Sequence, residues 1–369
     1  MLDLNQIIRP TAIIDQRRVL NNIARMSEKA HKSGVRFRPH FKTHQSAVIG
    51  NWFRNFGTRC ITVSSLDMAM YFAEHGWDDI TVAFPVNLRE IDKIRDLASR
   101  IRLNLLALSP EAVTFLQNEL QSPVGLWIKI DSGYRRTGMP WKDTESIVLL
   151  AKQIQRQSKT EFCGILTHSG NSYSASSLAE IRTIYAETVH RMQTVRKALT
   201  EAGITQCEIS IGDTPCCSVV DTFTGVDEVR PGNFVFYDAM QWRLGSCSEA
   251  DIAMVVACPV VALYPDRHHM VVYGGAVHLS KDFLLMPERR KIFGYVTSLL
   301  SGGWGPALPD AQVIALSQEH GIIQLSPEQM AQFRIGDLVA IIPVHSCLAA
   351  NLHKKYYTLD GEWIPMAQI

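Results

Sequence analysis

A lysine within a short basic segment is the first residue whose setting suggests chemistry. Residues 38–44 read RPHFKTH and lie at the end of a run, 35–40, that we expect to form a β-strand. A lysine amine beside other cationic groups can lose its proton near neutral pH and attack a carbonyl group, forming a Schiff base. Lys42 is therefore a candidate nucleophile, with a solvated basic turn as the alternative interpretation.

Two later segments also combine polar side chains with a preceding apolar run. Residues 129–138 read KIDSGYRRTG, and residues 167–173 read THSGNSY. Arg136 in the first segment could donate hydrogen bonds to an anionic oxygen, or it could be a structural arginine in a glycine turn. His168 in the second ends a strand-like run, where a histidine packs or caps more often than it catalyses.

Two glycine-containing segments could bind a phosphate group. Residues 211–215 read IGDTP, and residues 230–234 read RPGNF. Loops after the last strands of a barrel often bind phosphate through backbone N–H groups. Turns with Gly and Pro are common, so each segment alone is also typical of an ordinary loop.

A histidine and a cysteine separated by one residue follow another apolar run. Residues 343–347 read PVHSC after the run 338–342. In an extended chain, residues i and i+2 face the same side, so His345 and Cys347 could bind one ion. Imidazole and thiolate suit zinc better than magnesium or calcium, and two protein ligands would leave positions for water or substrate. A buried histidine and cysteine in a β domain are the alternative.

The first part of the chain must position most of these residues. Eight strand-like runs are expected at 35–40, 60–64, 80–84, 103–108, 126–131, 164–168, 208–211 and 229–237. Helical patterns alternate with them at 18–31, 66–74, 88–97, 110–119, 144–155 and 177–201. This α/β alternation over about 220 residues is typical of a (β/α)₈ barrel, although a doubly wound sheet alternates similarly.

The remainder of the chain has a different pattern. Short β-like runs occur at 252–263, 269–273, 311–316, 321–325, 338–343 and 356–359, separated by turn sequences. We expect a barrel domain at 1–248 and a mostly β domain at 249–369, with about the first ten residues of the chain packing on the second domain.

Composition excludes several classes of protein. Hydrophobic residues make up 46% of the 369 residues, as in globular proteins, and 37 basic against 36 acidic residues give a net charge of +1. Nothing in that charge favours nucleic acid or an anionic membrane as a partner. No apolar run reaches the roughly 18 residues of a membrane span, and the N-terminal ten residues do not resemble a signal peptide. The eight cysteines form no CxxC pair, so we expect reduced thiols in a cytoplasmic protein.

The segment RPHFKTH resembles the lysine motif of the fold type III pyridoxal-phosphate enzymes, which have an alanine-racemase-like barrel. More narrowly, it is similar to the motif of the D-serine dehydratase and D-threonine aldolase group. Further matches extend to the C-terminus, so the resemblance covers nearly the whole chain. It implies a PLP-binding (β/α)₈ TIM barrel followed by a mostly β C-terminal domain, with Lys42 carrying pyridoxal 5'-phosphate.

The same resemblance implies roles for the other motifs. Arg136 would approach the phenolic oxygen of the cofactor, His168 would contact its pyridine ring, and Tyr173 would face the ring nitrogen, leaving that nitrogen largely unprotonated. The phosphate would be held by Gly212, Thr214, Gly232 and Asn233. Two residues depart from the family pattern: Asn171 replaces a histidine, and Phe234 replaces an aromatic hydroxyl residue.

The family carries a metal pair at the place of His345 and Cys347, which implies a divalent metal, with zinc favoured over manganese or magnesium. In that group His-x-Cys resembles the dehydratases and His-x-Asp the aldolases. The implied activity is a lyase reaction on β-hydroxy-D-amino acids of the D-serine or D-threonine dehydratase (ammonia-lyase) type. A D-threonine aldolase, cleaving its substrate to glycine and an aldehyde, is the alternative. Glu319 and His320 match a family motif, with no role assigned beyond support of this site.

Two further classes share parts of this pattern. An amino-acid racemase would need a second base, for which Tyr273 is a candidate in a poorly matching context. A non-catalytic PLP-binding protein is the non-enzyme interpretation, but such proteins are usually a bare barrel. Family members are dimers with active sites at the subunit interface, so the resemblance implies a homodimer acting on a small D-amino acid.

Overall fold

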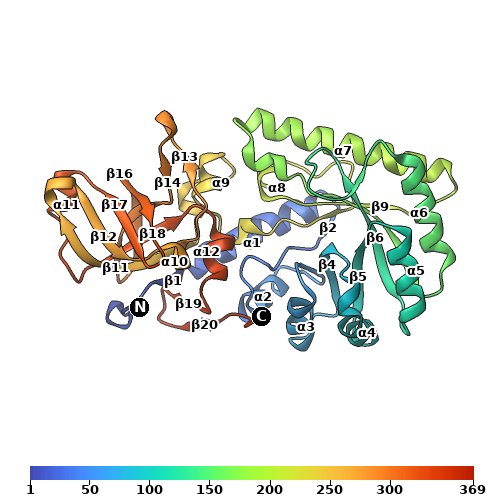
Figure 1. Ribbon diagram of the computed structural model, residues 1–369, viewed down its shortest axis with the longest axis horizontal. Coiled ribbons are helices and arrows are strands. Elements are labelled where there is room, and N and C mark those ends of the chain that lie inside the picture. Colours follow the sequence, from blue (N-terminus) through green and yellow to red (C-terminus); the bar gives the residue numbers. More distant parts are fainter. The chain divides into compact units, whose positions relative to one another are not determined.

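The computed structural model describes the backbone of residues 1–369 and every side chain except that of Glu288. Its internal contacts define two compact units whose sequence ranges interleave (Figure 1). Unit 1 contains Met1–Ile23, Thr43–Gly50 and Asn233–Gln368. Unit 2 contains Ala24–Lys42, Asn51–Gly232 and the terminal Ile369.

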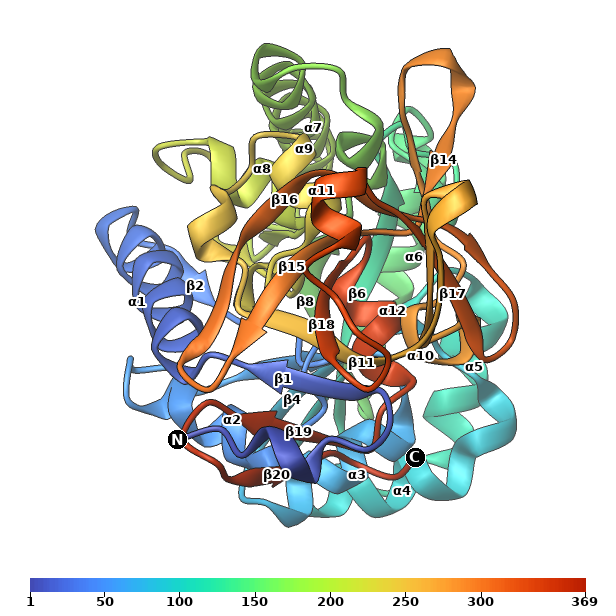
Figure 2. The same cartoon turned by 90° about the vertical axis from the view of Figure 1, so that its left-hand side faces the viewer.

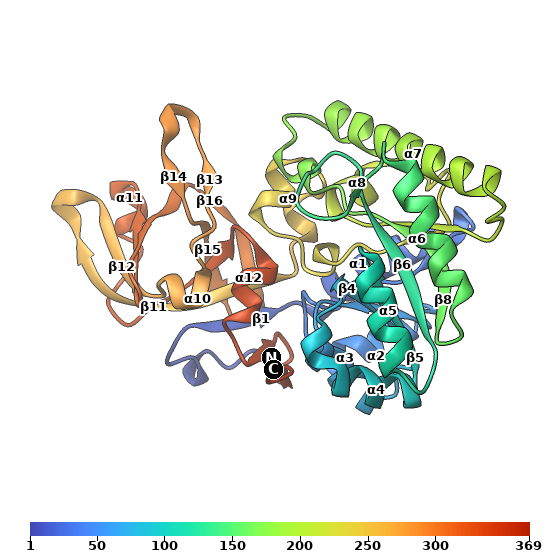
Figure 3. The same cartoon turned by 45° about the vertical axis from the view of Figure 1, so that its right-hand side comes forward.

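Unit 2 is built on a sheet of eight parallel strands, ordered β2-β10-β9-β8-β6-β5-β4-β3. The two edges of this sheet also meet, because an isolated parallel bridge pairs His40, just beyond β2, with Thr62 of β3. The sheet therefore closes into a barrel, and the expected (β/α)₈ architecture is confirmed. Figure 3 shows the helices lying outside these strands.

The strands of this barrel have the bounds β2 Arg36–Phe37, β3 Ile61–Val63, β4 Asp79–Pro85, β5 Arg102–Ala107, β6 Val124–Asp131, β8 Thr160–Leu166, β9 Glu208–Ile211 and β10 Glu228–Val229. A short strand, β7 Met139–Pro140, pairs with β6. The helices that follow the strands are α2 Ala47–Arg54, α3 Leu66–Glu74, α4 Ile91–Arg100, α5 Pro110–Glu119, α6 Thr144–Arg156, α7 Leu178–Glu201 and α8 Thr214–Val219. The helix α1, Gln16–Lys32, precedes β2.

The eighth barrel strand is shorter than the sequence pattern predicts. We expected a strand over 229–237, but β10 ends at Val229 and a 3₁₀ turn forms over Asn233–Val235. Pro231 has no backbone N–H to donate to a strand ladder, which explains why the pairing stops there. The RPGNF segment is consequently a loop after the strand, where a phosphate-binding loop would lie.

Unit 1 is an antiparallel structure in which six strands close on themselves. Its sheet order is β12-β17-β16-β15-β18-β11-β1-β19-β20, and β12 also pairs with β11. The enclosed core contains fourteen buried side chains, among them Val256, Val296 and Ile341. The expected C-terminal β architecture is therefore confirmed.

The strands of unit 1 have the bounds β1 Thr11–Ile14, β11 Met254–Tyr264, β12 His269–Tyr273, β15 Gly294–Leu300, β16 Gly303–Leu316, β17 His320–Gln324, β18 Leu338–Pro343, β19 Lys355–Thr358 and β20 Trp363–Pro365. A separate hairpin joins β13 Leu284–Leu285 to β14 Lys291–Ile292, and the short helices are α9 Ala239–Arg243, α10 Ala276–Leu279, α11 Pro327–Met330 and α12 Ser346–Asn351.

The N-terminal segment adds a strand that the sequence pattern did not reveal. The four residues of β1 are all buried and pair with β11 on one side and β19 on the other (Figure 2). A four-residue apolar run carries too little periodicity to distinguish a strand from a turn of helix. Within the described residues, no helix is both long enough and apolar enough to cross a bilayer.

Candidate functional site

Lys42 extends from a backbone that is fixed by the residue before it. Phe41 is fully buried, and its ring centroid lies 5.0 Å from those of Phe53 and Phe72. The Phe41 backbone N–H donates to the Thr62 carbonyl oxygen at 2.8 Å. Lys42 itself is exposed, so its flexible side chain begins at a rigid point after the first barrel strand.

His168 is held in one neutral form. Its Nδ1 atom contacts the carbonyl oxygen of Gly212, which can only accept, so Nδ1 carries the proton and Nε2 does not. Burial lowers the pKa of His168 well below its usual range, and the nearby positive charges of Lys42 and Arg136 lower it further. Lys129 acts in the same direction. Lys42 and Arg136 therefore lie close enough to His168 for their charges to act on it.

Two tyrosines flank the imidazole of His168. The ring centroid of Tyr173 lies 6.2 Å from that of His168, and the ring of Tyr134 lies 6.3 Å from it. The Tyr173 hydroxyl oxygen accepts a hydrogen bond from the Thr214 backbone N–H at 3.3 Å. Because Tyr134 packs directly on Gly170, a Cβ atom at Gly170 would lie only 2.2 Å from its ring. Tyr134 was not singled out by the sequence pattern.

Arg136 lies in a loop that is shaped by an aspartate at the end of β6. The Asp131 Oδ1 atom accepts hydrogen bonds from the backbone N–H groups of Gly133 and Arg135, each at 2.9 Å. Arg135 adopts a left-handed φ of 61° in this turn. The guanidinium carbon of Arg136 then lies 5.4 Å from the ring centroid of Tyr134, a cation–π contact.

The loop after β9 depends on glycine for its close approach to the next strand. A Cβ atom at Gly212 would lie 2.8 Å from the carbonyl oxygen of Arg230, so a larger residue would push the two segments apart. Asp213 then caps α8, accepting from the Cys216 backbone N–H at 2.8 Å. Gly212 therefore lies in the loop after β9, beside Arg230, and Thr214 is the first residue of α8.

Two buried cations near this loop were missed by sequence reasoning. Lys129 is 5% exposed, and burial lowers its pKa well below the usual range, with further lowering by Arg230 and Arg136. Arg230 donates to the Ser210 hydroxyl and to the Thr167 carbonyl oxygen, each at 2.7 Å. Lys129 could have been noticed in the sequence, because it is a lysine inside an otherwise apolar strand. Arg230 lies beside a loop of Pro and Gly, and nothing in that pattern indicated a buried arginine.

His345 and Cys347 meet, but by a different local structure from the one predicted. We expected an extended chain, and only His345 is extended, with φ −133° and ψ 104°. Cys347 is the second residue of α12, which begins at Ser346. The Cys347 thiol is nevertheless among the groups that raise the pKa of His345, so the two side chains interact. The extended-chain argument was therefore wrong for Cys347, because a helix starts between the two residues.

Each member of this pair has further polar contacts. The His345 Nδ1 atom lies 2.8 Å from Asp282 Oδ2. Burial alone would lower the pKa of His345, but its hydrogen bonds to Asp282 and Cys347 outweigh burial and raise that pKa to about 11. The Cys347 Sγ atom lies 3.1 Å from the Thr43 hydroxyl oxygen and 3.6 Å from the Asn233 amide nitrogen. Apart from the unplaced side chain of Glu288, no group of three His, Cys, Asp or Glu residues could hold a metal ion.

The side chain of Asn233 points toward this pair. Its amide nitrogen donates to Asp238 at 2.6 Å and to Ser346 at 3.0 Å, in addition to its contact with Cys347. Asp238 also accepts from the Ser346 backbone N–H at 2.9 Å. Any contribution of Asn233 to a phosphate site would consequently come from its backbone, while its side chain contacts the candidate metal ligand.

The Glu319 and His320 motif lies at the turn into β17. Glu319 approaches His278, with 3.7 Å between the carboxylate and imidazole Nε2 atoms, and His320 is exposed and pairs with Tyr273 across the strands. The ring of Tyr273 packs against His278 at 5.4 Å between centroids. These contacts belong to unit 1, and they give the motif a packing role there.

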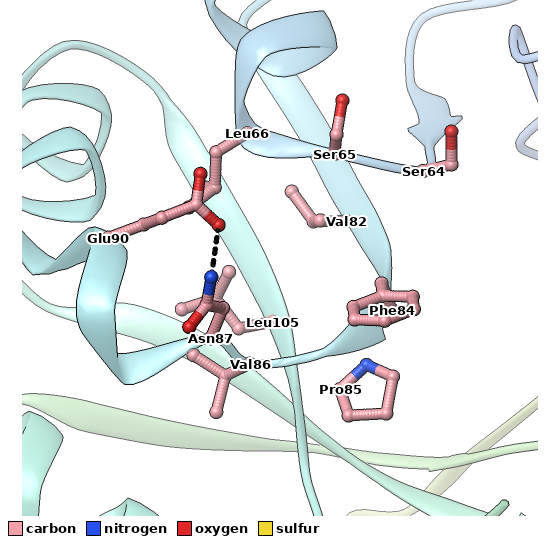
Figure 4. Close-up of a pocket in the computed structure, with 10 residues that line it drawn as sticks. All are labelled: Ser64, Ser65, Leu66, Val82, Phe84, Pro85, Val86, Asn87, Glu90 and Leu105. Atoms are coloured by element: carbon pink, nitrogen blue, oxygen red, sulfur yellow. Dashed lines mark hydrogen bonds between the residues drawn. The ribbon is translucent and has the colours of Figure 1, made fainter.

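Unit 2 contains a cavity of about 170 Å³ that none of the sequence-predicted site residues lines (Figure 4). Its lining includes Val82 of β4 and Leu105 of β5. The rest of the lining comes mainly from the segments that follow β3 and β4, among them Ser64, Val86 and Glu90.

The donor groups fit the two cofactors that the motifs suggested. A neutral imidazole, a tyrosine hydroxyl, an arginine and an exposed lysine share one end of the unit 2 barrel, where a pyridine ring with an anionic oxygen could be bound. An imidazole and a thiol in contact suit a divalent metal of borderline softness. A parallel barrel with this lysine after its first strand defines the fold type III class of pyridoxal-phosphate enzymes.

Comparison with known proteins places the chain within that class. The model of the alanine racemase N-terminal domain matches residues 14–239, and that of the putative serine dehydratase domain matches residues 253–359. D-Serine dehydratase of Dictyostelium discoideum is 31% identical, over 98% of this chain and 95% of its own. The chain therefore belongs to the D-serine dehydratase family of alanine-racemase-like proteins.

Solved structures agree with this assignment. D-threo-3-hydroxyaspartate dehydratase from Delftia sp. HT23 has a TM-score of 0.92 and 27% identity, covering 100% of this chain and 99% of that one. A cysteine-to-alanine variant of the same dehydratase has been solved in a metal-free form. D-threonine aldolase from Filomicrobium marinum shares the fold, with a TM-score of 0.83 at 19% identity and coverage of 97% and 96%.

Proposed function

We propose that this chain is a pyridoxal-phosphate- and metal-dependent lyase that dehydrates β-hydroxy-D-amino acids. The observation that carries the proposal is the placement of His345 and Cys347 two residues apart at the start of α12, where the two side chains interact. A two-residue site leaves coordination positions for a substrate hydroxyl and water. Relatives named as dehydratases, at 31% and 28% identity, support dehydration over aldol cleavage.

Pyridoxal phosphate, when bound, supplies an electron sink for the charge that develops at the substrate Cα atom. Lys42 would hold it covalently and, once displaced by the substrate amine, its Nζ atom would take the Cα proton. The Tyr173 hydroxyl would donate to the ring nitrogen, since its oxygen already accepts from Thr214. Neutral His168 would pack on the ring, and Arg136 would donate to the phenolic oxygen.

A divalent metal on His345 and Cys347 would supply Lewis acidity to the β-hydroxyl group of the substrate. We propose zinc, because imidazole and thiolate ligands suit it better than they suit magnesium or manganese. In a dehydration the Cα–H and Cβ–O bonds break and water leaves. The resulting enamine tautomerises to an imine, and a second water hydrolyses it to a 2-oxo acid and ammonia.

Product analysis tests this proposal against its alternatives. Pyruvate from D-serine and 2-oxobutyrate from D-threonine, each with one equivalent of ammonia, would support dehydration. Glycine plus an aldehyde would establish the aldolase, and L-enantiomers without ammonia would establish a racemase. No turnover of any β-hydroxy-D-amino acid by protein loaded with pyridoxal phosphate and zinc would refute the lyase assignment.

The assembly and location of the protein are also proposals. We propose a homodimer, as the resemblance to the D-serine dehydratase group implies, and light scattering after size exclusion would measure it. None of the eight cysteines forms a disulfide bond, which suits a reducing compartment such as the cytoplasm. Fractionation of cells that express the protein would test that location.

A further inference from the structure

The contacts of His345 determine which of its two nitrogens can bind a metal. Nδ1 lies 2.8 Å from the Asp282 Oδ2 atom, and a carboxylate at this distance accepts a proton-bearing nitrogen. Nδ1 is therefore the N–H donor, and Nε2 is the nitrogen that a neutral imidazole would offer to an ion. Carboxylate groups fix metal-binding histidines in this way in many proteins.

Asp282 follows a turn that ends the helix α10. Ser280, two residues earlier, adopts a left-handed φ of 66°, which is costly for a residue with a side chain. Its hydroxyl oxygen accepts a hydrogen bond from the Asp282 backbone N–H at 3.2 Å. Ser280 is also the residue that ends α10, where its backbone N–H donates to the Ala276 carbonyl oxygen at 3.0 Å, and Asp282 is 63 residues from His345 in the sequence.

Hydrogen-bond donors surround the sulfur of Cys347, whereas the group beside His345 Nδ1 is an acceptor. The Asn233 amide donates to its sulfur, and the Thr43 hydroxyl can donate as well. Asp238 accepts hydrogen bonds from the Asn233 amide and from the Ser346 backbone N–H, and these bonds fix the position of the Asn233 amide. An acceptor behind the imidazole and donors around the sulfur are the arrangement that suits a neutral imidazole and a thiolate acting as two ligands of one cation.

We propose that Asp282 is a positioning residue for the metal: by accepting the Nδ1 proton it orients His345 to bind through Nε2. The proposal rests on the metal site described under the proposed function. Asp282 does not touch the ion in this arrangement, because it contacts the nitrogen opposite the coordinating one. Replacement of Asp282 should accordingly weaken metal binding without removing a ligand.

Zinc affinity of the pyridoxal-phosphate-loaded protein is the direct measurement. Competition with a chromophoric chelator, after removal of the native metal, should show about 10–100-fold weaker zinc binding for Asp282→Ala. Asp282→Asn retains an oxygen acceptor without the charge, so its loss should be smaller. Asp266→Ala, which removes an exposed carboxylate of the same unit, is the matched control and should bind zinc like the wild type.

Two spectroscopic measurements separate positioning from a general loss of structure. Cobalt(II) bound to Asp282→Ala should retain the thiolate-to-metal charge-transfer band of Cys347, since that ligand is intact. Long-range ¹H–¹⁵N spectra of the zinc-bound wild type should show the His345 proton on Nδ1. Thermal unfolding should remain close to that of the control variant, because the Asp282 side chain is 38% exposed.

Equal zinc affinity for Asp282→Ala and Asp266→Ala would overturn the role of Asp282 while leaving the metal site in place. A proton on Nε2, or loss of the cobalt–thiolate band in Asp282→Ala, would overturn it as well. If the wild type bound no zinc at all, the proposed metal site itself would fail, which is a different outcome from either of these.

Discussion

Glu228 is the buried charge whose replacement should most clearly destabilise the barrel. It is fully buried at the start of β10, and its carboxylate accepts from Arg36 and Arg38 at 2.7 Å each and from the Ser210 hydroxyl at 2.6 Å. Arg38 is only 3% exposed and otherwise pairs with Asp79. Glu228→Gln would keep the shape but leave the Arg38 guanidinium with half of its compensating charge.

The pKa of Glu228 gives the size of the effect. Burial alone would raise this pKa, but the charges of Arg38 and Arg36 prevail and lower it from 4.5 to about 2. That difference corresponds to about 3 kcal/mol of unfolding free energy at neutral pH. Breaking a buried ion pair by removing one partner costs about 3–5 kcal/mol, which agrees. The contribution is present above about pH 4.5 and is lost as the pH falls through about 2.

Urea and thermal unfolding at neutral pH would measure this prediction. Glu228→Gln should lower the midpoint temperature by about 6–20 °C, at 2–4 °C per kcal/mol for a unit of this size. Glu201→Gln is the control, because Glu201 is 66% exposed in its 3.8 Å ion pair with Lys197 and should change stability by less than about 0.5 kcal/mol. If both variants unfolded at the same midpoint, the reasoning from buried charge would be wrong.

Three further predictions concern the candidate site. Borohydride reduction followed by peptide mapping should find the cofactor on Lys42, and Lys42→Ala should lower kcat by at least about 10²–10⁴-fold; cofactor on another lysine would contradict this. Cys347→Ala should lose metal and β-elimination while retaining bound pyridoxal phosphate, and Cys347→Asp should shift metal preference toward manganese or magnesium, as elemental analysis would show. Gly170→Ala should displace Tyr134 and cost about 1–3 kcal/mol of stability, whereas an unchanged unfolding midpoint would mean that the ring moves freely.

The alternation of strands and helices was predictable because the local spacing of apolar residues determines it. The expected helices at 66–74 and 110–119 have the same bounds as α3 and α5, where Ser65 and Ser109 cap the first turns. The strands at 208–211 and 338–343 became β9 and β18 with similar precision. Apolar spacing and capping act within a few residues, so they do not depend on the rest of the fold.

Elements that depend on distant partners were less predictable. The strand β1 forms because β11 and β19 flank it, and the eighth barrel strand stops early because of Pro231. Cys347 lies in the helix α12, which was not predicted because the apolar run before it has the pattern of a strand. In each of these cases the local sequence is compatible with more than one conformation, and long-range pairing selects between them.

The sequence by itself determined the class of this protein, because the residues of each motif are contiguous and their chemistry is local to them. The lysine segment 38–44, the arginine loop 129–138 and the pair His345 and Cys347 were all found without coordinates. The tertiary structure alone decided which charges face one another: Lys129 and Arg136 beside His168, and Asp282 behind His345. Asp282 is 63 residues from its histidine, and no spacing rule connects two residues that only the tertiary fold of unit 1 brings within hydrogen-bonding distance.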